Sequence, residues 1–356
     1  MCTSTMWRFD LPESIAALKG INLKGLPWKN GGLVFSKKRT DLIEWLSALF
    51  KGNLDRLQEI PCGQCLECRM SKSREMTQRA CHEASYYKDN WFLTLTYDDQ
   101  KLKDEDLIKS INPVTFQSGI FININMHEVS DFLKRLRSRI AYKTGHLGVR
   151  AVYCSEYGPL HGRAHYHVNL FNCPIPDLKV FKKEYVGGKS YFYYTSDIVS
   201  ECWGHGNIVL VPFCYETAAY VSRYILKKQN GKNRAAYEEA CQVAGVQPMH
   251  NESVQYPTRP GLGRQFYEDN RDLIYEYDGV ILPNGHQAKP ARYYDKLFDL
   301  DHPEEMEKIR ASRRRVADLV RFNKLKAAKL QNSDQLAKIR GLYLRQRLKK
   351  LPRQDL

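Results

Sequence analysis

Two strand-like segments joined by a short turn constrain the fold of this chain more than any other feature. VRAVYCSEYG (residues 149–158) and AHYHVNLFN (residues 164–172) are rich in β-branched and aromatic residues, and a turn-rich stretch separates them. A connection this short pairs the two strands antiparallel. If it is symmetric about Leu160 and His161, Glu156 lies directly opposite His165. The sequence therefore predicts a sheet built around this pair.

The surrounding segments predict further strands and amphipathic helices. NWFLTLTYDD contains a buried strand over Phe92–Tyr97 that ends at Asp98 and Asp99, and GNIVLVPF is another strand. MHEVSDFLKRLRSRI (residues 126–140) has apolar residues at a helical period, and SREMTQRACHEASYYKD is a second predicted helix. DLIEWLSALF is a short amphipathic stretch near the N-terminus. We therefore expect a sheet with helices beside it.

His165 and His167 alternate along the second strand, so they present two imidazoles on one face, about 6.7 Å apart along the strand. Neutral imidazole nitrogens are common metal ligands. With Glu156 opposite, the three residues form a two-histidine, one-carboxylate set that suits Mg²⁺ or Mn²⁺ and leaves positions open for phosphate oxygens. The alternative is a strand with two polar residues and no metal.

Tyr220 and Tyr224 lie one helical turn apart in AAYVSRYILKK, so both phenols face the same side of a helix. A phenol is a poor nucleophile near neutral pH unless a metal withdraws charge from the phosphate under attack. Attack yields a phosphotyrosine ester and a free sugar hydroxyl, and a second tyrosine permits a second cut. Arg223, Lys227 and Lys228 add positive charge that would hold phosphate. The alternative is a structural helix whose aromatic side chains fill the core.

The formal net charge of +15 indicates a polyanionic partner, although basic proteins are not all nucleic-acid binders. Arg163, in the turn before the histidine strand, is a further candidate phosphate ligand. The last 56 residues contain 16 Lys and Arg but 7 Asp and Glu. Their helical periodicity and small apolar content predict a mostly exposed basic helix or helix pair that contacts nucleic acid or a partner.

Ten cysteines without a recognisable signal peptide indicate a reducing compartment. No apolar run approaches the roughly 20 residues that span a bilayer. Cys62, Cys65 and Cys68 follow a C-x2-C-x2-C spacing that favours structural zinc, with Cys81 or His82 as the fourth ligand. Reduced thiols without a metal and an iron–sulfur cluster are the alternatives.

Several of these motifs resemble those of HUH endonucleases. YCSEYGPLHGRAHYHVNLF resembles the His-hydrophobic-His motif of that family, and FLTLTYDD resembles its first strand motif. AAYVSRYILKK resembles the two-tyrosine motif of the rolling-circle replication initiators of small single-stranded DNA phages. PCGQCLECR, RPGLGRQFYE and ARYYDKLFD are similar to segments of initiators from gokushovirus-type microviruses. The resemblance covers most of Pro61–Leu300, with the motifs in the family's order.

The resemblance implies an α+β fold with a palm-like central antiparallel sheet flanked by helices, to which we add the basic helical C-terminal extension. It implies a divalent metal at His165 and His167 and nucleophiles at Tyr220 and Tyr224. Glu156 as third ligand transfers less securely, because that position varies among related families. We expect an N-terminal extension (1–60), an endonuclease domain that includes the cysteines (61–255), an accessory segment (256–300) and a basic helical tail (301–356).

Initiators of this kind nick single-stranded DNA, leave a 5′-phosphotyrosine and a 3′-OH that primes host polymerase, and rejoin strands to end rolling-circle replication. The resemblance therefore implies a metal-dependent DNA nickase and strand transferase. Its expected partners are a single-stranded replication origin and host replication machinery in the bacterial cytoplasm, with no membrane. A relaxase or transposase with the same chemistry is one alternative, and a non-catalytic, zinc-containing nucleic-acid-binding protein is the other.

Overall fold

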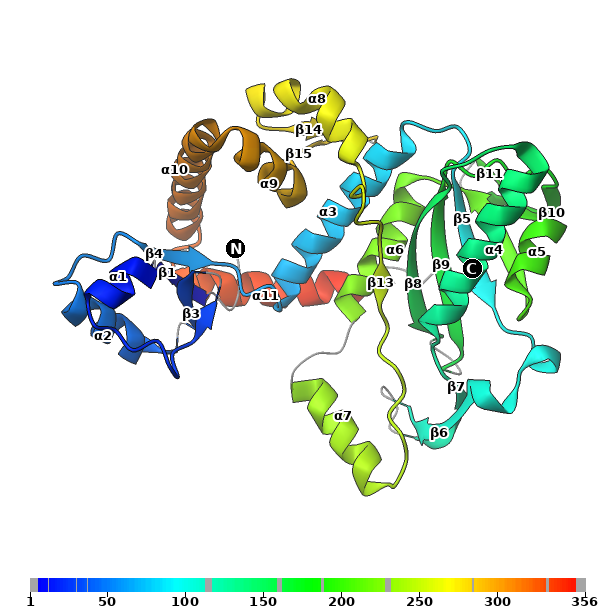
Figure 1. The fold of residues 1–356 in the computed structure, drawn as a ribbon, viewed down its shortest axis with the longest axis horizontal. Coiled ribbons are helices and arrows are strands. Elements are labelled where there is room, and N and C mark those ends of the chain that lie inside the picture. The colour runs from blue at the N-terminus through cyan, green and yellow to red at the C-terminus, as the bar shows by residue number, and fades with distance from the viewer. Residues whose placement is uncertain are drawn as a thin grey trace. The chain divides into compact units, whose positions relative to one another are not determined.

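The computed structural model describes residues 6–11, 13–29, 31–36, 38–112, 117–158, 162–186, 189–227, 232–283, 285–330 and 333–349 (Figure 1). The chain forms two compact units, one of residues 1–71 with 311–356 and one of residues 72–310. Each unit contains its own antiparallel sheet. The division predicted at residues 60, 255 and 300 stays a prediction.

The first unit contains a four-stranded sheet with the strand order β2-β3-β1-β4. Its strands are β1 (Met6–Asp10), β2 (Trp28–Lys29), β3 (Gly32–Ser36) and β4 (Leu57–Ile60). Helices α1 (Glu13–Leu18) and α2 (Thr40–Leu49) follow β1 and β3. Helix α2 is the amphipathic stretch predicted near the N-terminus, and it buries Leu42 and Leu46, one turn apart, in a core with Phe9 and Leu33.

The second unit contains a seven-stranded antiparallel sheet with the order β10-β11-β12-β5-β9-β8-β13. Its strands are β5 (Trp91–Thr96), β8 (Arg150–Tyr157), β9 (Ala164–Phe171), β10 (Lys179–Val186), β11 (Lys189–Thr195), β12 (Ile208–Pro212) and β13 (Val254–Gln255). Strands β8 and β9 pair with Glu156 opposite His165, which confirms the predicted register. On the other side of β9, strand β5 places Thr94 opposite His167.

Helices cover both faces of this sheet (Figure 1). Helices α4 (Met126–Thr144) and α5 (Asp197–Trp203) pack on one face, together with Leu93 and Leu95 of β5. Helix α6 (Tyr215–Lys227) and residues 72–84 of α3 (Leu66–Ala84) pack on the other face, around Phe92. Side chains alternate along a strand, so β5 serves both layers. The apolar period predicted for residues 126–140 is confirmed, since α4 buries five of its residues, Val129, Phe132, Leu133, Leu136 and Ile140.

Smaller elements complete the second unit. They are the 3-10 helices η1 (Asp99–Lys101) and η2 (Asp104–Asp106), the hairpins β6 (Leu107–Ile111) with β7 (Ser118–Ile122) and β14 (Val280–Ile281) with β15 (Gln287–Ala288), and the helices α7 (Lys232–Val243), α8 (Arg264–Glu276) and α9 (Arg292–Asp301). Helices α8 and α9 share a core that contains Tyr267, Tyr294 and Phe298.

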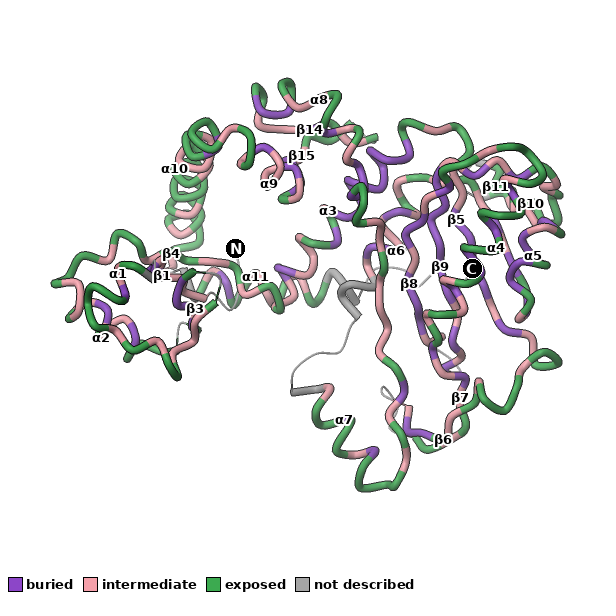
Figure 2. The backbone as a smooth tube through the Cα atoms, in the orientation of Figure 1, coloured by how far each residue is buried: buried purple, intermediate pink, exposed green. Residues whose placement is uncertain are grey.

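The C-terminal region is helical, as predicted. It consists of α10 (Pro303–Ala327) and α11 (Ser333–Lys349), and α10 is mostly exposed in Figure 2. The predicted α+β class, with a large antiparallel sheet flanked by helices, is confirmed. Among the described residues, no helix combines the length and the apolar character that crossing a membrane requires.

Candidate metal and nucleophile site

Glu156, His165 and His167 converge at the centre of the seven-stranded sheet, on the face that α6 covers. The Nε2 atom of His165 lies 3.2 Å from Glu156 Oε2, and the Nε2 atom of His167 lies 3.5 Å from the same oxygen. One ligand atom from each residue falls within 4.8 Å of the other two. Glu156 and His167 are only 4% and 2% exposed, so their orientation is fixed by packing. Strand alternation in β9 and the antiparallel register with β8 produce this convergence.

Both histidines place their other ring nitrogen on an oxygen atom. His165 Nδ1 lies 3.2 Å from the carbonyl oxygen of Arg163, and His167 Nδ1 lies 3.1 Å from Thr94 Oγ1. A carbonyl oxygen only accepts, so His165 donates from Nδ1, and in the neutral ring its Nε2 is left with a lone pair. Thr94 can impose the same tautomer on His167. Metal-binding histidines are oriented in this way, with Nδ1–H on an oxygen and Nε2 toward the ion.

The donor set fits a hard divalent cation. Two imidazole nitrogens and one carboxylate oxygen provide three ligands, and an Mg²⁺ or Mn²⁺ ion commonly completes its shell with water or phosphate oxygens. The rings meet edge to face, 4.9 Å apart between centroids, and Phe92 stacks on His167 at 5.3 Å. This apolar floor holds the ligands in place.

Tyr220 reaches the same point from α6. Its hydroxyl donates to Glu156 Oε2 at 3.4 Å, and its ring packs edge-on against His167 with centroids 4.9 Å apart. The Oε2 atom of Glu156 is therefore shared by two imidazoles and a phenol. Tyr224 belongs to the same helix one turn later, but its side chain lies outside the described residues.

The basic residues predicted to hold phosphate have different surroundings. The guanidinium of Arg223 lies over the Tyr220 ring, 5.5 Å from its centroid, so it accompanies the phenol. Arg163 forms an ion pair with Asp99 at 2.6 Å and donates to the carbonyl of Tyr97, so its charge is partly compensated. The side chain of Lys227 and the whole of Lys228 lie outside the described residues.

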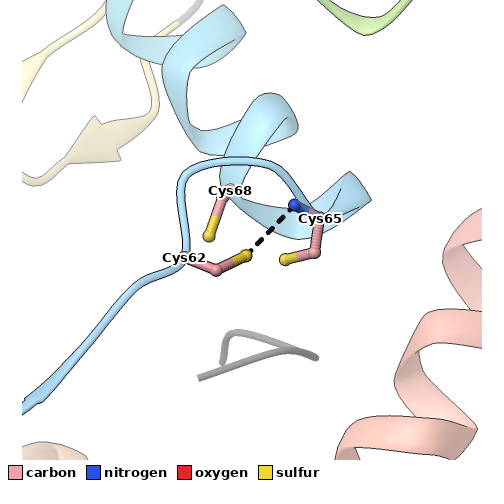
Figure 3. Close-up of side chains that lie close together, drawn as sticks. All are labelled: Cys62, Cys65 and Cys68. Carbon is pink, nitrogen blue, oxygen red and sulfur yellow. Dashed lines mark hydrogen bonds between the residues drawn. The ribbon is translucent and has the colours of Figure 1, made fainter. Parts of the chain in front are cut away.

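The structure also brings Cys62, Cys65 and Cys68 together (Figure 3). Cys81 is not part of this group, and its prediction as the fourth ligand is corrected. It lies thirteen residues after Cys68 on the same helix, which is about 20 Å at the usual rise. Burial raises the pKa of the Cys81 thiol to about 12, which disfavours the thiolate that a metal requires. His82, the other candidate, stacks on Phe266 and bonds to Tyr294.

Comparisons with known proteins converge on one family. The family model for replication-associated protein ORF2 matches residues 90–229, the segment that contains β5, β8, β9 and α6. The chain is 32% identical over 248 residues to "Replication-associated protein VP4" of Bdellovibrio phage phiMH2K, covering 69% of each chain. It is 28% identical over 271 residues to "Replication-associated protein ORF2" of Spiroplasma virus 4, covering 74% of this chain and 76% of that one.

A third relative is more distant. "Replication-associated protein ORF4" of Chlamydia phage 1 is 27% identical over 198 residues, which are 53% of this chain and 45% of that one. No solved structure matches. The family-model match falls on the strands and helix that form the site, and the phiMH2K alignment extends well beyond that segment. The chain therefore belongs to the family of replication-associated protein ORF2, with relatives in microvirus-type phages.

Proposed function

We propose that this protein initiates rolling-circle replication by nicking single-stranded DNA at an origin through attack by a tyrosine, and that it later rejoins the strands. One observation carries the proposal. The Nε2 atoms of His165 and His167 and the hydroxyl of Tyr220 all meet at a single carboxylate oxygen of Glu156. A metal site and a nucleophile at one point are what phosphoryl transfer to a tyrosine requires.

In the nicking step, the Tyr220 oxygen forms a bond to phosphorus and the bond from phosphorus to the 3′ oxygen breaks. The products are a 5′-phosphotyrosine and a 3′-OH, and the phenol proton is balanced by the proton taken up at the 3′ oxygen. Glu156 and the edge-on contact with His167 hold the phenol in the site. The neighbouring Arg223 lies close enough to the phenol ring to favour anionic groups beside it.

A divalent ion held by His165, His167 and Glu156 would supply a Lewis acid for the scissile phosphate. The residues of the chain keep these ligands ready, since Thr94 and the Arg163 carbonyl orient both imidazoles. We assign Mg²⁺ or Mn²⁺ to this site because its donors are nitrogen and oxygen.

We assign Tyr224 the role of the second nucleophile. It follows Tyr220 by one helical turn, so the backbone of α6 carries both on the same side. Attack by the second phenol would keep the protein attached to DNA while a second strand is cut. Rejoining is the reverse reaction, in which a 3′-OH attacks the phosphotyrosine and releases the phenol. Lys227 and Lys228 extend the positive charge of this helix.

The edge hairpin of β10 and β11 offers a surface for the DNA strand. Tyr194 of β11 pairs with Leu210 and packs with the α4 core, so its neighbour Tyr193 and, two residues earlier, Tyr191 lie on the face that carries the metal site. Tyr191 is 49% exposed, and Lys182 lies over the Tyr193 ring. Aromatic rings beside lysines stack single-stranded bases and attract their phosphates.

The direct test uses a single-stranded origin oligonucleotide, Mn²⁺ and a denaturing gel that reveals a covalent protein–DNA adduct. Wild-type protein is expected to form the adduct, and the double variant Tyr220→Phe with Tyr224→Phe is expected to form none. Tyr215→Phe, on the same helix, serves as the control and should retain adduct formation. An adduct of normal yield in the double variant would refute the assignment of the tyrosines. Mass spectrometry of the linked peptide identifies which tyrosine attacks first.

If the protein is active in replication, its partners are the phage origin and the host enzymes that extend the 3′-OH, and it acts in the cytoplasm of the bacterial host. A fluorescent origin hairpin with scrambled controls would separate a replication initiator from a relaxase or transposase, because only an initiator prefers the phage origin.

A further inference from the structure

We propose that Cys62, Cys65 and Cys68 bind one zinc ion as a closed structural site. The three sulfur atoms lie within 4.8 Å of one another, and none of these cysteines is in a disulfide (Figure 3). Thiolates at Zn–S distances of about 2.3 Å in a tetrahedron lie about 3.8 Å apart. The observed grouping is therefore close to what one zinc ion requires.

Local backbone structure produces this grouping. Cys62 and Cys65 lie in the short connection between β4 and α3, and Gly63 turns the chain there with a φ of +73°. The backbone N–H of Cys65 donates to Cys62 Sγ at 3.2 Å. Cys68 lies in the first turn of α3, where the N-terminal end of the helix favours thiolate. N–H donation to sulfur and a helix N-terminus both stabilise negative charge on these thiols.

The chemistry of the donors selects the metal. Three sulfur ligands favour a soft ion, in contrast to the nitrogen and oxygen ligands of the site at Glu156. An iron–sulfur cluster attaches its thiolates to different iron atoms, which separates the sulfur atoms further than a single ion does. Without a metal, ionised thiols this close together repel one another. A mononuclear zinc ion satisfies all three at once.

Zinc in structural sites takes four ligands, so a fourth donor is needed. We propose Cys2, whose placement lies outside the described residues, on the basis of chain reach alone. Strand β1 begins at Met6, which pairs with Ile60, the last residue of β4. Four residues extend at most about 14 Å, and Cys62 follows Ile60 by two residues. A thiol at position 2 is therefore within range of the cluster.

Such a site would fasten the end of β4 and the start of α3 in a unit whose apolar core is small. That core contains seven fully or nearly buried apolar residues, Phe9, Leu11, Ala16, Leu33, Phe35, Leu42 and Leu46. Small units commonly need a metal or another cross-link for stability. Zinc binding would then contribute directly to the folding free energy of this unit.

The test measures metal content and does not depend on DNA cleavage, so its result is separate from that of the proposed nicking reaction. Full-length protein purified without chelator is expected to contain about one zinc per chain by elemental analysis. Cys65→Ser should reduce this to near zero, whereas Cys214→Ser, which alters an exposed thiol on another segment, should leave it unchanged. A wild-type protein without zinc, or a Cys65→Ser variant that keeps it, would overturn the proposal.

Cobalt substitution covers the case in which Cys65→Ser does not fold. Co²⁺ added to metal-free wild-type protein should give intense thiolate charge-transfer and tetrahedral d–d bands, and octahedral spectra would refute a thiolate site. Cys2→Ser should lower the charge-transfer intensity by about one quarter, because one of four thiolates is lost. Unchanged intensity in this variant would exclude Cys2 as the fourth ligand.

Discussion

Thr94 is predicted to control metal binding although it does not contact the metal. It lies on β5 opposite His167, is 7% exposed, and places Oγ1 3.1 Å from His167 Nδ1. Thr94→Val replaces the hydroxyl with a methyl group of similar size, so the packing is preserved. The change removes the acceptor that keeps the proton on Nδ1 and the lone pair on Nε2.

The expected magnitude follows from two independent estimates. Loss of a partner for a buried donor costs about 1–3 kcal/mol. Loss of a partner that orients a metal ligand typically lowers metal affinity 10–100-fold, or about 1.4–2.8 kcal/mol at 25 °C. The two ranges agree, so we expect Thr94→Val to weaken Mn²⁺ binding by between one and two orders of magnitude.

The assay is calorimetric titration of Mn²⁺ into the metal-free protein. Thr94→Ser keeps the hydroxyl and should restore most of the affinity. Thr96→Val is the matched control, because the Thr96 hydroxyl donates to the carbonyl of Asn207 and not to a histidine. If Thr94→Val and Thr96→Val lower the affinity equally, or if neither lowers it, Thr94 does not orient His167 for a metal and the argument from tautomers is wrong.

Three further predictions follow from the same structure. Glu156→Gln should abolish the rise in melting temperature that Mn²⁺ causes in wild-type protein, as scanning fluorimetry with and without the ion would show. Burial lowers the pKa of His82 from 6.5 to about 4, so the unfolded chain takes up the proton first as the pH falls. Its contribution to stability is complete above about pH 6.5 and is lost toward pH 4, a loss of about 3 kcal/mol that urea unfolding at both pH values would detect and that His82→Gln should reduce. Replacing Tyr191 and Tyr193 with alanine should weaken binding of single-stranded DNA about tenfold or more by fluorescence anisotropy, whereas Tyr185→Ala, on the opposite face of the hairpin, should change it little.

The local features of the site were predictable because they depend on short-range geometry. A strand alternates its side chains and a short connection fixes the register, so Glu156 opposite His165 followed from counting residues across the turn. The placement of Tyr220 on a helix followed from the helical period. Convergence of α6 on the sheet was inferred only from the combination of motifs, since no local rule places a helix over a particular strand.

The remaining features depend on contacts between distant segments. The role of Thr94 requires that β5 be the neighbour of β9, which is a pairing across about seventy residues that no spacing rule provides. The short strands β1, β3 and β4 carry too few residues for a clear alternating pattern, so the sheet of the first unit was not predicted. Cys81 was assigned to the cysteine group from spacing alone, and a continuous helix α3 carries it away from Cys68.

The two proposed metal sites differ in a way that lets their roles be separated. The site at Glu156 offers nitrogen and oxygen donors and needs open positions for phosphate, whereas the site at Cys62 offers sulfur donors and is closed if a fourth thiolate is present. A strong chelator should therefore remove both ions, but Mg²⁺ alone can refill only the first site, because magnesium does not bind thiolates. If Mg²⁺ restores DNA nicking to protein that has lost zinc, the cysteine site stabilises the fold without taking part in the reaction. If nicking returns only when zinc is also supplied, the first unit must be folded for the second to act, and zinc would then be a structural requirement of the reaction.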